Sequence, residues 1–140
     1  MPLLEHDGQI RELLSGARTI AVVGLSDSPS RDSHSIGRYL LEAGYEVIPV
    51  NPTLRSVFGI PCVPDLEHLA GRNVDIADVF RRPEHAAAVV RGALRATIGS
   101  LWFQFGTSNP DAVRTAISAG LGVVSERCIM VEHAHLFPRP

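Results

Sequence analysis

A serine-rich loop with one arginine follows the first apolar run of the chain, and its residue types suit the binding of phosphate groups. The loop GLSDSPSR occupies residues 24–31, between the run TIAVV and a segment of helical period. A helix N-terminus offers unpaired backbone N–H groups and the positive end of the helix dipole, so it attracts anions. The hydroxyl groups of Ser26, Ser28 and Ser30 and the guanidinium of Arg31 would add hydrogen bonds. The loop therefore predicts a site for a phosphate-bearing ligand.

The elements that must position this loop follow from the hydrophobic pattern. Apolar runs bounded by glycine and proline alternate with amphipathic segments, which is typical of βα units around a mainly parallel sheet. The pattern predicts one domain over residues 1–140, with helices near 7–14, 33–43, 82–96, 110–119 and 128–136. Strands are expected near 19–24, 46–50, 59–63, 74–80, 99–104 and 122–125. Right-handed crossovers would order them 3-2-1-4-5-6, a doubly wound, Rossmann-like α/β sheet of five to six strands with helices on both faces.

This topology places the ligand crevice at the carboxyl ends of the first and fourth strands. Residues distant in the sequence would meet there: the loop at 24–28, Asn51 with Pro52, Phe80 with Arg81 and Arg82, and Gln104 with residues 105–106.

Local signals define some of the helix starts. Asn109 is expected to cap the helix that Pro110 begins, and Ser33 is expected to cap the helix after the phosphate loop. His6, His34, His68 and His85 share no spacing, so we expect them to face solvent.

The composition narrows the functional classes. The 140 residues carry a net charge of −2, which disfavours nucleic-acid binding, and no apolar stretch approaches the length of a membrane span. Neither a signal nor a transit peptide is visible, so a cytoplasmic location is expected, with Cys62 and Cys128 as free thiols.

The phosphate loop departs from the dinucleotide-binding pattern. That pattern needs G-x-G-x-x-G and an acid at the end of the second strand. Here Gly24 precedes Leu25 and Ser26, and the second strand ends in Asn51 and Pro52. NAD is therefore disfavoured.

The motifs together resemble the stand-alone CoA-binding proteins, a Rossmann-like family related to the CoA-binding domain of succinyl-CoA synthetase. The resemblance covers nearly the whole chain: AVVGLSD at 21–27, RxS at 31–33, YLLEAGY at 39–45, PVNP at 49–52, VDIADVFR at 74–81, WFQFG at 102–106 and ERCIMVEH at 126–133. It implies that the loop from Gly24 through Leu25, Ser26 and Ser28 to Arg31 wraps the CoA diphosphate. By the same resemblance, Asn51 and Pro52 border the adenine and its ribose, and Phe80, Arg81 and Gln104 face the pantetheine arm.

The last motif departs from the family pattern, with Met130 where a lysine is common and His135 where an arginine is common. Cys128, Glu132 and His135 fall on one helix face, a pattern also compatible with a metal or Cys-His site, although no further ligand is evident. Cys128 could instead form a mixed disulfide with CoA, if it lies near the pantetheine end.

No P-loop, G-x-S-x-G elbow or H-E-x-x-H helix is present in the sequence. We therefore expect a non-catalytic CoA or acyl-CoA binding module without a metal, acting as a carrier, a sensor or a partner subunit of another protein, or as a homo-oligomer. The alternatives are a small Rossmann-type oxidoreductase that binds NAD(P), and a thiol-dependent acyl-transfer enzyme that uses Cys128 with His133 or His135.

Overall fold

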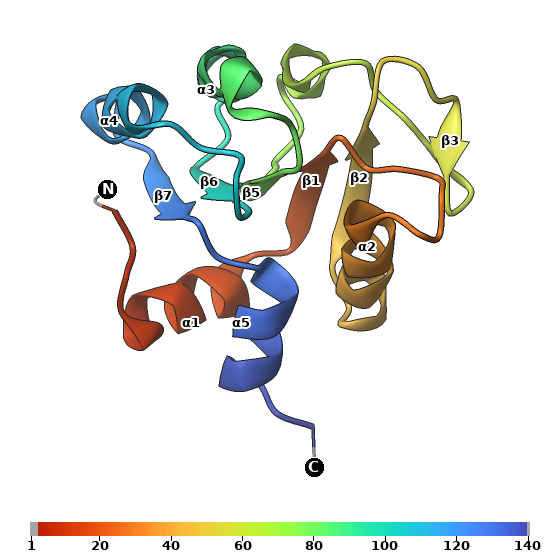
Figure 1. Cartoon of the computed structure of the whole chain (residues 1–140), viewed down its shortest axis with the longest axis horizontal. Coiled ribbons are helices and arrows are strands. Elements are labelled where there is room, and N and C mark those ends of the chain that lie inside the picture. Colours follow the sequence, from red (N-terminus) through yellow and green to blue (C-terminus); the bar gives the residue numbers. More distant parts are fainter. Residues whose placement is uncertain (1–2, 140) are drawn as a thin grey trace.

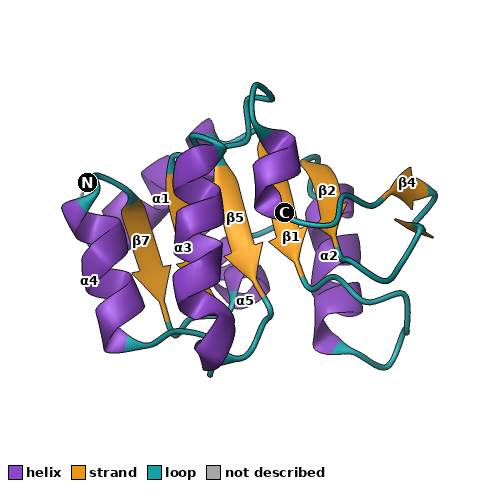
Figure 2. Ribbon diagram, turned by 90° about the horizontal axis from the view of Figure 1, so that it is seen from above, coloured by secondary structure: helices purple, strands orange, loops and turns teal. Residues whose placement is uncertain are grey.

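Five parallel strands form the central sheet of the computed structural model, which describes residues 3–139. The strand order is β2-β1-β5-β6-β7, with each pair parallel, and the arrows run the same way in Figure 2. The bounds are Thr19–Val23 for β1, Glu46–Val50 for β2, Ile76–Val79 for β5, Ser100–Phe103 for β6 and Gly122–Ser125 for β7. The Rossmann-like α/β prediction is confirmed.

Helices cover both faces of the sheet (Figure 1). One face carries α3 and α4, and the other carries α1, α2 and α5. The bounds are Asp7–Gly16 for α1, Asp32–Glu42 for α2, Ala86–Arg95 for α3, Pro110–Ser118 for α4 and Ile129–Leu136 for α5. Short 3₁₀ turns form at Leu66–Leu69 and Pro83–His85. None of the described helices is long and apolar enough to cross a membrane.

The strands are continuous apolar runs because both of their faces are buried. Along β1, Ala21 and Val23 pack under α3 and α4, whereas Ile20 and Val22 join the core under α1, α2 and α5. The chain leaves β1 toward β2 on one side and later reaches β5 on the other side. The sheet therefore has its switch point between β1 and β5, where this topology leaves a crevice.

The prediction that residues 59–63 form a strand of the central sheet is wrong. Ile60–Pro61 (β4) instead pairs antiparallel with Ser56–Val57 (β3) in a separate hairpin. Phe58 and Gly59 both have positive φ, at 55° and 74°, as a tight hairpin turn requires. Pro61 has no N–H to donate to a neighbouring strand of the central sheet. Among the described residues, a single isolated bridge, between Val63 and Val50, joins this region to β2.

Asn109 caps α4 as expected, since its Oδ1 accepts a hydrogen bond from the Ala112 N–H at 2.8 Å. His6, His68 and His85 are exposed, also as expected.

Candidate functional site

The phosphate loop begins at a glycine that no other residue could replace without strain. Gly24 has φ +88°, and a Cβ there would lie 3.1 Å from the Phe80 carbonyl oxygen and 3.1 Å from Arg81 Cδ. Its N–H donates to the Val50 carbonyl at 2.8 Å. Gly24 therefore lets the ends of β1, β2 and β5 approach one another at the mouth of the crevice.

Hydrogen bonds from neighbouring elements hold the loop in one conformation. The Ser26 N–H donates to Ser33 Oγ at 3.0 Å, and the Ser28 N–H donates to Ser26 Oγ at 3.0 Å. Asn51 Nδ2, at the end of β2, donates to the Leu25 carbonyl at 3.1 Å. Side chains from α2 and from the residue after β2 thus organise the loop.

The start of α2 differs from the sequence expectation. Arg31, in an extended conformation, is the N-cap residue, and Ser33 lies inside the first turn. Ser33 was expected to cap the helix, but its hydroxyl instead accepts the Ser26 N–H. The cap position makes no side-chain hydrogen bond. No capping side chain therefore lies in front of the first-turn N–H groups of α2.

His34 is buried, so its expected exposure is wrong. Its Nδ1 lies 2.9 Å from the Ser26 carbonyl, and because a carbonyl only accepts, Nδ1 is the nitrogen that carries the proton. Its ring packs 4.6 Å from the Phe58 ring, and its Nε2 is buried with no hydrogen-bond partner in the described structure. His34 therefore holds the phosphate loop through its hydrogen bond to the Ser26 carbonyl.

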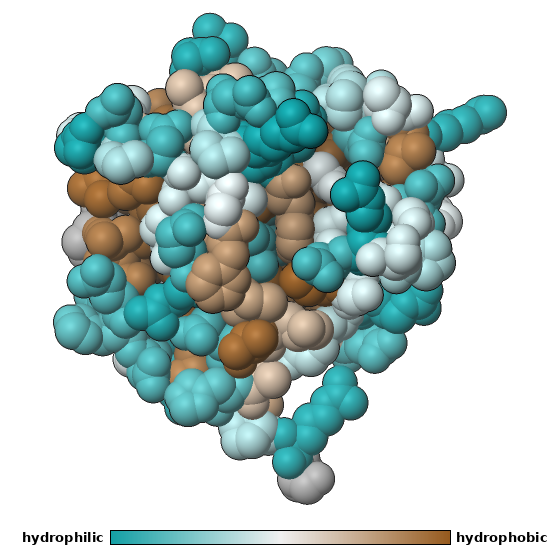
Figure 3. Space-filling view, viewed as in Figure 1, coloured by the Kyte–Doolittle hydropathy of each residue, from teal (hydrophilic) through white to brown (hydrophobic). Residues whose placement is uncertain are grey.

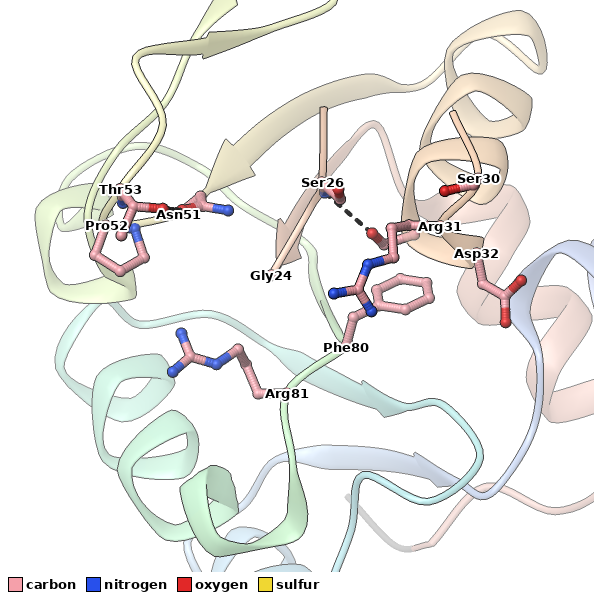
Figure 4. Close-up of a pocket in the computed structure, with 11 residues that line it drawn as sticks. Gly24, Ser26, Ser30, Arg31, Asp32, Asn51, Pro52, Thr53, Phe80 and Arg81 are labelled. Atoms are coloured by element: carbon pink, nitrogen blue, oxygen red, sulfur yellow. Dashed lines mark hydrogen bonds between the residues drawn. The ribbon is translucent and has the colours of Figure 1, made fainter. Parts of the chain in front are cut away.

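A cavity of about 670 Å³, which we call the loop cavity, opens between β1, β2 and β5 (Figure 4). Two cationic side chains line it, Arg31 from the start of α2 and Arg81 from the end of β5. Neither makes an ion pair with any residue that the structure describes. Asp32 contributes a carboxylate to the lining. Two unpaired guanidiniums beside a helix N-terminus give the cavity the chemistry of an anion site.

Seven of the ten predicted site residues line this cavity: Gly24, Ser26, Arg31, Asn51, Pro52, Phe80 and Arg81. Leu25 is fully buried in the core, and Ser28 lies outside the lining, 3.0 Å from the Ser30 hydroxyl. Sequence reasoning missed Asp32, Ser33 and Thr53 as lining residues. Thr53 donates through both its N–H and its hydroxyl to Asn51 Oδ1 at 2.9 Å, a turn that the Asn-Pro pair could have signalled.

Gln104, the tenth residue, lines a neighbouring cavity of about 430 Å³ with Cys128 and Met130, which we call the second cavity. Asp32 and Phe80 line both cavities, so the two are adjacent along the carboxyl edge of the sheet. That edge faces the viewer in Figure 3, where apolar surface in the middle is surrounded by hydrophilic surface. Gln104 is 5% exposed, and its Oε1 accepts from the Ile129 N–H at 3.1 Å, which fixes the start of α5.

Asp78 is a buried acid in the central sheet that sequence reasoning passed over. It lies in β5 between Val22 of β1 and Trp102 of β6, two residues before Phe80. It is 0% exposed, and neither carboxyl oxygen has a hydrogen-bond partner in the described structure. Burial raises the pKa of Asp78 well above its ordinary value, because it disfavours the charged form of the carboxyl group. An acid inside an otherwise apolar strand was the available signal.

The side chains of Cys128, Glu132 and His135 do not meet at one point. Glu132 pairs with Arg127 at 2.9 Å, and His135 pairs with Asp7 at 3.3 Å. Within residues 3–139, no group of three metal-ligating side chains comes together. His133 Nδ1 lies 2.8 Å from the Tyr39 hydroxyl, and burial, followed by the charge of Arg139, lowers the pKa of His133.

A family model and a bacterial protein both match most of this chain. Residues 18–134 match the family model described as a CoA binding domain. The protein YneT of Bacillus subtilis (strain 168) is 40% identical over 126 residues, which cover 90% of this chain and 93% of YneT.

Solved structures from archaea and bacteria share the fold. A Pyrococcus horikoshii OT3 protein is 37% identical with a TM-score of 0.91, covering 97% of this chain and 96% of its own. A Thermus thermophilus protein is 41% identical with a TM-score of 0.89, covering 95% of this chain and 100% of its own. An acetyl-coenzyme A synthetase from Ca. Korarchaeum cryptofilum is 28% identical with a TM-score of 0.71 over 82% of this chain and 27% of its own.

Proposed function

The chain belongs to the CoA-binding domain family, and on that premise we propose that it binds coenzyme A or an acyl-CoA in the crevice between β1 and β5. The diphosphate lies against the phosphate loop and the first turn of α2. The adenine and its ribose lie beside Asn51 and Pro52, and the pantetheine arm passes Phe80 into the second cavity.

One observation carries this proposal: Arg31 and Arg81 line the loop cavity without an ion-pair partner in the described structure. Unpaired guanidiniums beside the start of a helix are suited to a diphosphate, which they bind by charge-assisted hydrogen bonds. Two or three such bonds contribute about 1.5–3 kcal/mol each, and a helix N-terminus adds up to about 2 kcal/mol. This gross total is on the order of the 8 kcal/mol of micromolar binding, and burial of the adenine offsets the cost of association.

The two adjacent cavities also suit a ligand with two chemically different ends. Their volumes, about 670 and 430 Å³, are within the range of small-molecule sites. CoA has an anionic nucleotide end and a long neutral arm that ends in a thiol. The loop cavity offers cations, whereas the second cavity offers the apolar side chains of Ile36 and Met130 together with the Gln104 amide.

We also propose that the chain holds CoA without turning it over. The titratable side chains that line the two cavities are Arg31, Arg81, Asp32 and Cys128. General acid–base chemistry needs a group that titrates near the working pH within reach of the substrate. His133 and His135 are engaged with Tyr39 and Asp7, and neither makes a hydrogen bond to Cys128 in residues 3–139. This arrangement favours a carrier, a sensor or a partner subunit.

Isothermal titration calorimetry with CoA, acetyl-CoA, NAD and NADP tests the proposal. We expect micromolar or tighter binding of CoA and much weaker binding of both dinucleotides. Thermal shift at matched concentrations should show the same selectivity, because a ligand stabilises the folded state to which it binds. Selective stabilisation by NAD or NADP would contradict the proposal and favour the oxidoreductase alternative.

A further inference from the structure

Cys128 lies where the thiol end of a bound CoA would arrive. It is the N-cap residue of α5, is partly exposed, and lines the second cavity with Gln104, Phe105 and Met130. This cavity is adjacent to the loop cavity through Asp32 and Phe80. A ligand whose diphosphate lies at the phosphate loop therefore has a route along the sheet edge to the Cys128 sulfur.

Gln104 gives independent support for a polar chain in the second cavity. The residue is nineteen-twentieths buried, and its Oε1 accepts a hydrogen bond from the Ile129 N–H. Its Nε2 has no hydrogen-bond partner in the part of the chain that the structure describes, and the residue lines the cavity. This amide N–H is available to donate a hydrogen bond to a ligand with a carbonyl oxygen. The pantetheine arm contains two amide carbonyls and ends in a thiol.

We propose that Cys128 is a thiol–disulfide exchange site for CoA disulfides, which rests on the proposed binding of CoA. The Cys128 thiolate attacks one sulfur of a bound CoA disulfide, and the S–S bond of that disulfide breaks. A new bond joins Cys128 Sγ to one CoA sulfur, and the electron pair leaves with the second CoA as a thiolate. Cys128 is oxidised and half of the disulfide is reduced, so no other oxidant is needed. A free thiol such as reduced CoA reverses the step.

The second cysteine provides a matched control. Cys62 follows β4 and packs against the core under α1, α2 and α5. Burial, followed by the charge of Asp27, raises the pKa of the Cys62 thiol, which lowers the fraction of reactive thiolate. Cys62 also lies outside both cavities. We therefore expect exchange at Cys128 and not at Cys62.

Intact-mass spectrometry after incubation with CoA disulfide tests the inference. The expected product is the protein plus one CoA less two hydrogen atoms, in the wild type and in Cys62→Ser but not in Cys128→Ser. Peptide mapping of the wild-type adduct places the modified residue even if the Cys128→Ser variant does not fold. The adduct should form at least tenfold faster with CoA disulfide than with glutathione disulfide, because binding of the nucleotide raises the effective concentration of the disulfide.

Calorimetry with reduced CoA, in the presence of a phosphine reductant, separates this inference from the proposed function. Binding of reduced CoA together with a Cys128 adduct supports both. Binding without an adduct, an adduct on Cys62, or equal rates with both disulfides overturns the exchange site and leaves CoA binding intact. Failure to bind reduced CoA overturns the proposed function, and any adduct would then be undirected thiol chemistry, which overturns the exchange site as well.

Discussion

Replacing Arg31 by alanine should weaken CoA binding by tenfold or more while leaving the fold intact. The Arg31 side chain is exposed and has no ion pair in the described structure. Its contribution to the start of α2 comes from the backbone, since its carbonyl accepts from the N–H groups of His34 and Ser35. Alanine keeps these bonds, so the free energy of unfolding should change by no more than about 0.5 kcal/mol.

The expected loss of affinity follows from the lost charge-assisted hydrogen bond. Such bonds contribute about 1.5–3 kcal/mol, and the exposure of Arg31 places it at the lower end of this range because solvent screens the charge. A loss of about 1.4 kcal/mol is tenfold in Kd. Calorimetry of Arg31→Ala should show this loss, and it should shrink as the salt concentration rises.

Two comparisons make this prediction specific. Arg114→Ala removes an exposed arginine that pairs with Asp111 on α4, so it should leave the CoA affinity unchanged. CoA that lacks its 3′-phosphate should show the same loss on Arg31→Ala as CoA itself, because Arg31 is assigned to the diphosphate. An unchanged affinity would remove Arg31 from the site, and a loss seen only with the 3′-phosphate present would refute its assignment to the diphosphate.

Further predictions concern residues that hold the phosphate loop in place and the buried acid in β5. Ser33→Ala should cost about 1 kcal/mol of stability in chemical denaturation and weaken CoA binding, because the Ser26 N–H loses its acceptor; an unchanged affinity would contradict the positioning role. Gly24→Ala should destabilise the fold by at least about 1–2 kcal/mol, since its φ is +88° and a Cβ would crowd the Phe80 carbonyl; a neutral effect on the denaturation midpoint would refute this. Burial raises the pKa of Asp78, so the folded state keeps a proton that the unfolded state releases above about pH 4, and stability falls as pH rises toward the folded-state pKa. The unfolding free energy of Asp78→Asn should therefore rise relative to that of the wild type as the pH increases above about 4, and a constant difference between the two would contradict a buried acid with a raised pKa.

The order of helices and strands could be predicted from the sequence, because hydrophobic periodicity and the glycine and proline residues that end an element are local signals. The alternation of apolar runs with amphipathic segments predicted the parallel sheet, and Asn109 with Pro110 predicted the start of α4. The strand expected at 59–63 failed because an apolar run does not reveal its partner. Phe58 and Gly59 turn the chain back on itself, so the run pairs with β3 instead of forming a full strand beside β2.

The meeting of the candidate-site residues at one crevice could be predicted from the sequence, but the hydrogen bonds that hold them could not. The switch-point rule placed Gly24, Asn51 and Phe80 at one crevice, and the structure brings them together. The roles of Ser33 and His34 could not be deduced, because both depend on how the phosphate loop folds back over α2. Hydrogen bonds of this kind join residues seven and eight positions apart and leave no periodic signal.

A crystal structure of the protein with CoA, grown under reducing conditions, tests the central claim most directly. We predict electron density for the diphosphate at the phosphate loop, between the guanidiniums of Arg31 and Arg81, with the pantetheine arm passing Phe80 toward Cys128. Density for CoA elsewhere on the molecule, with the crevice between β1 and β5 empty, would contradict the account.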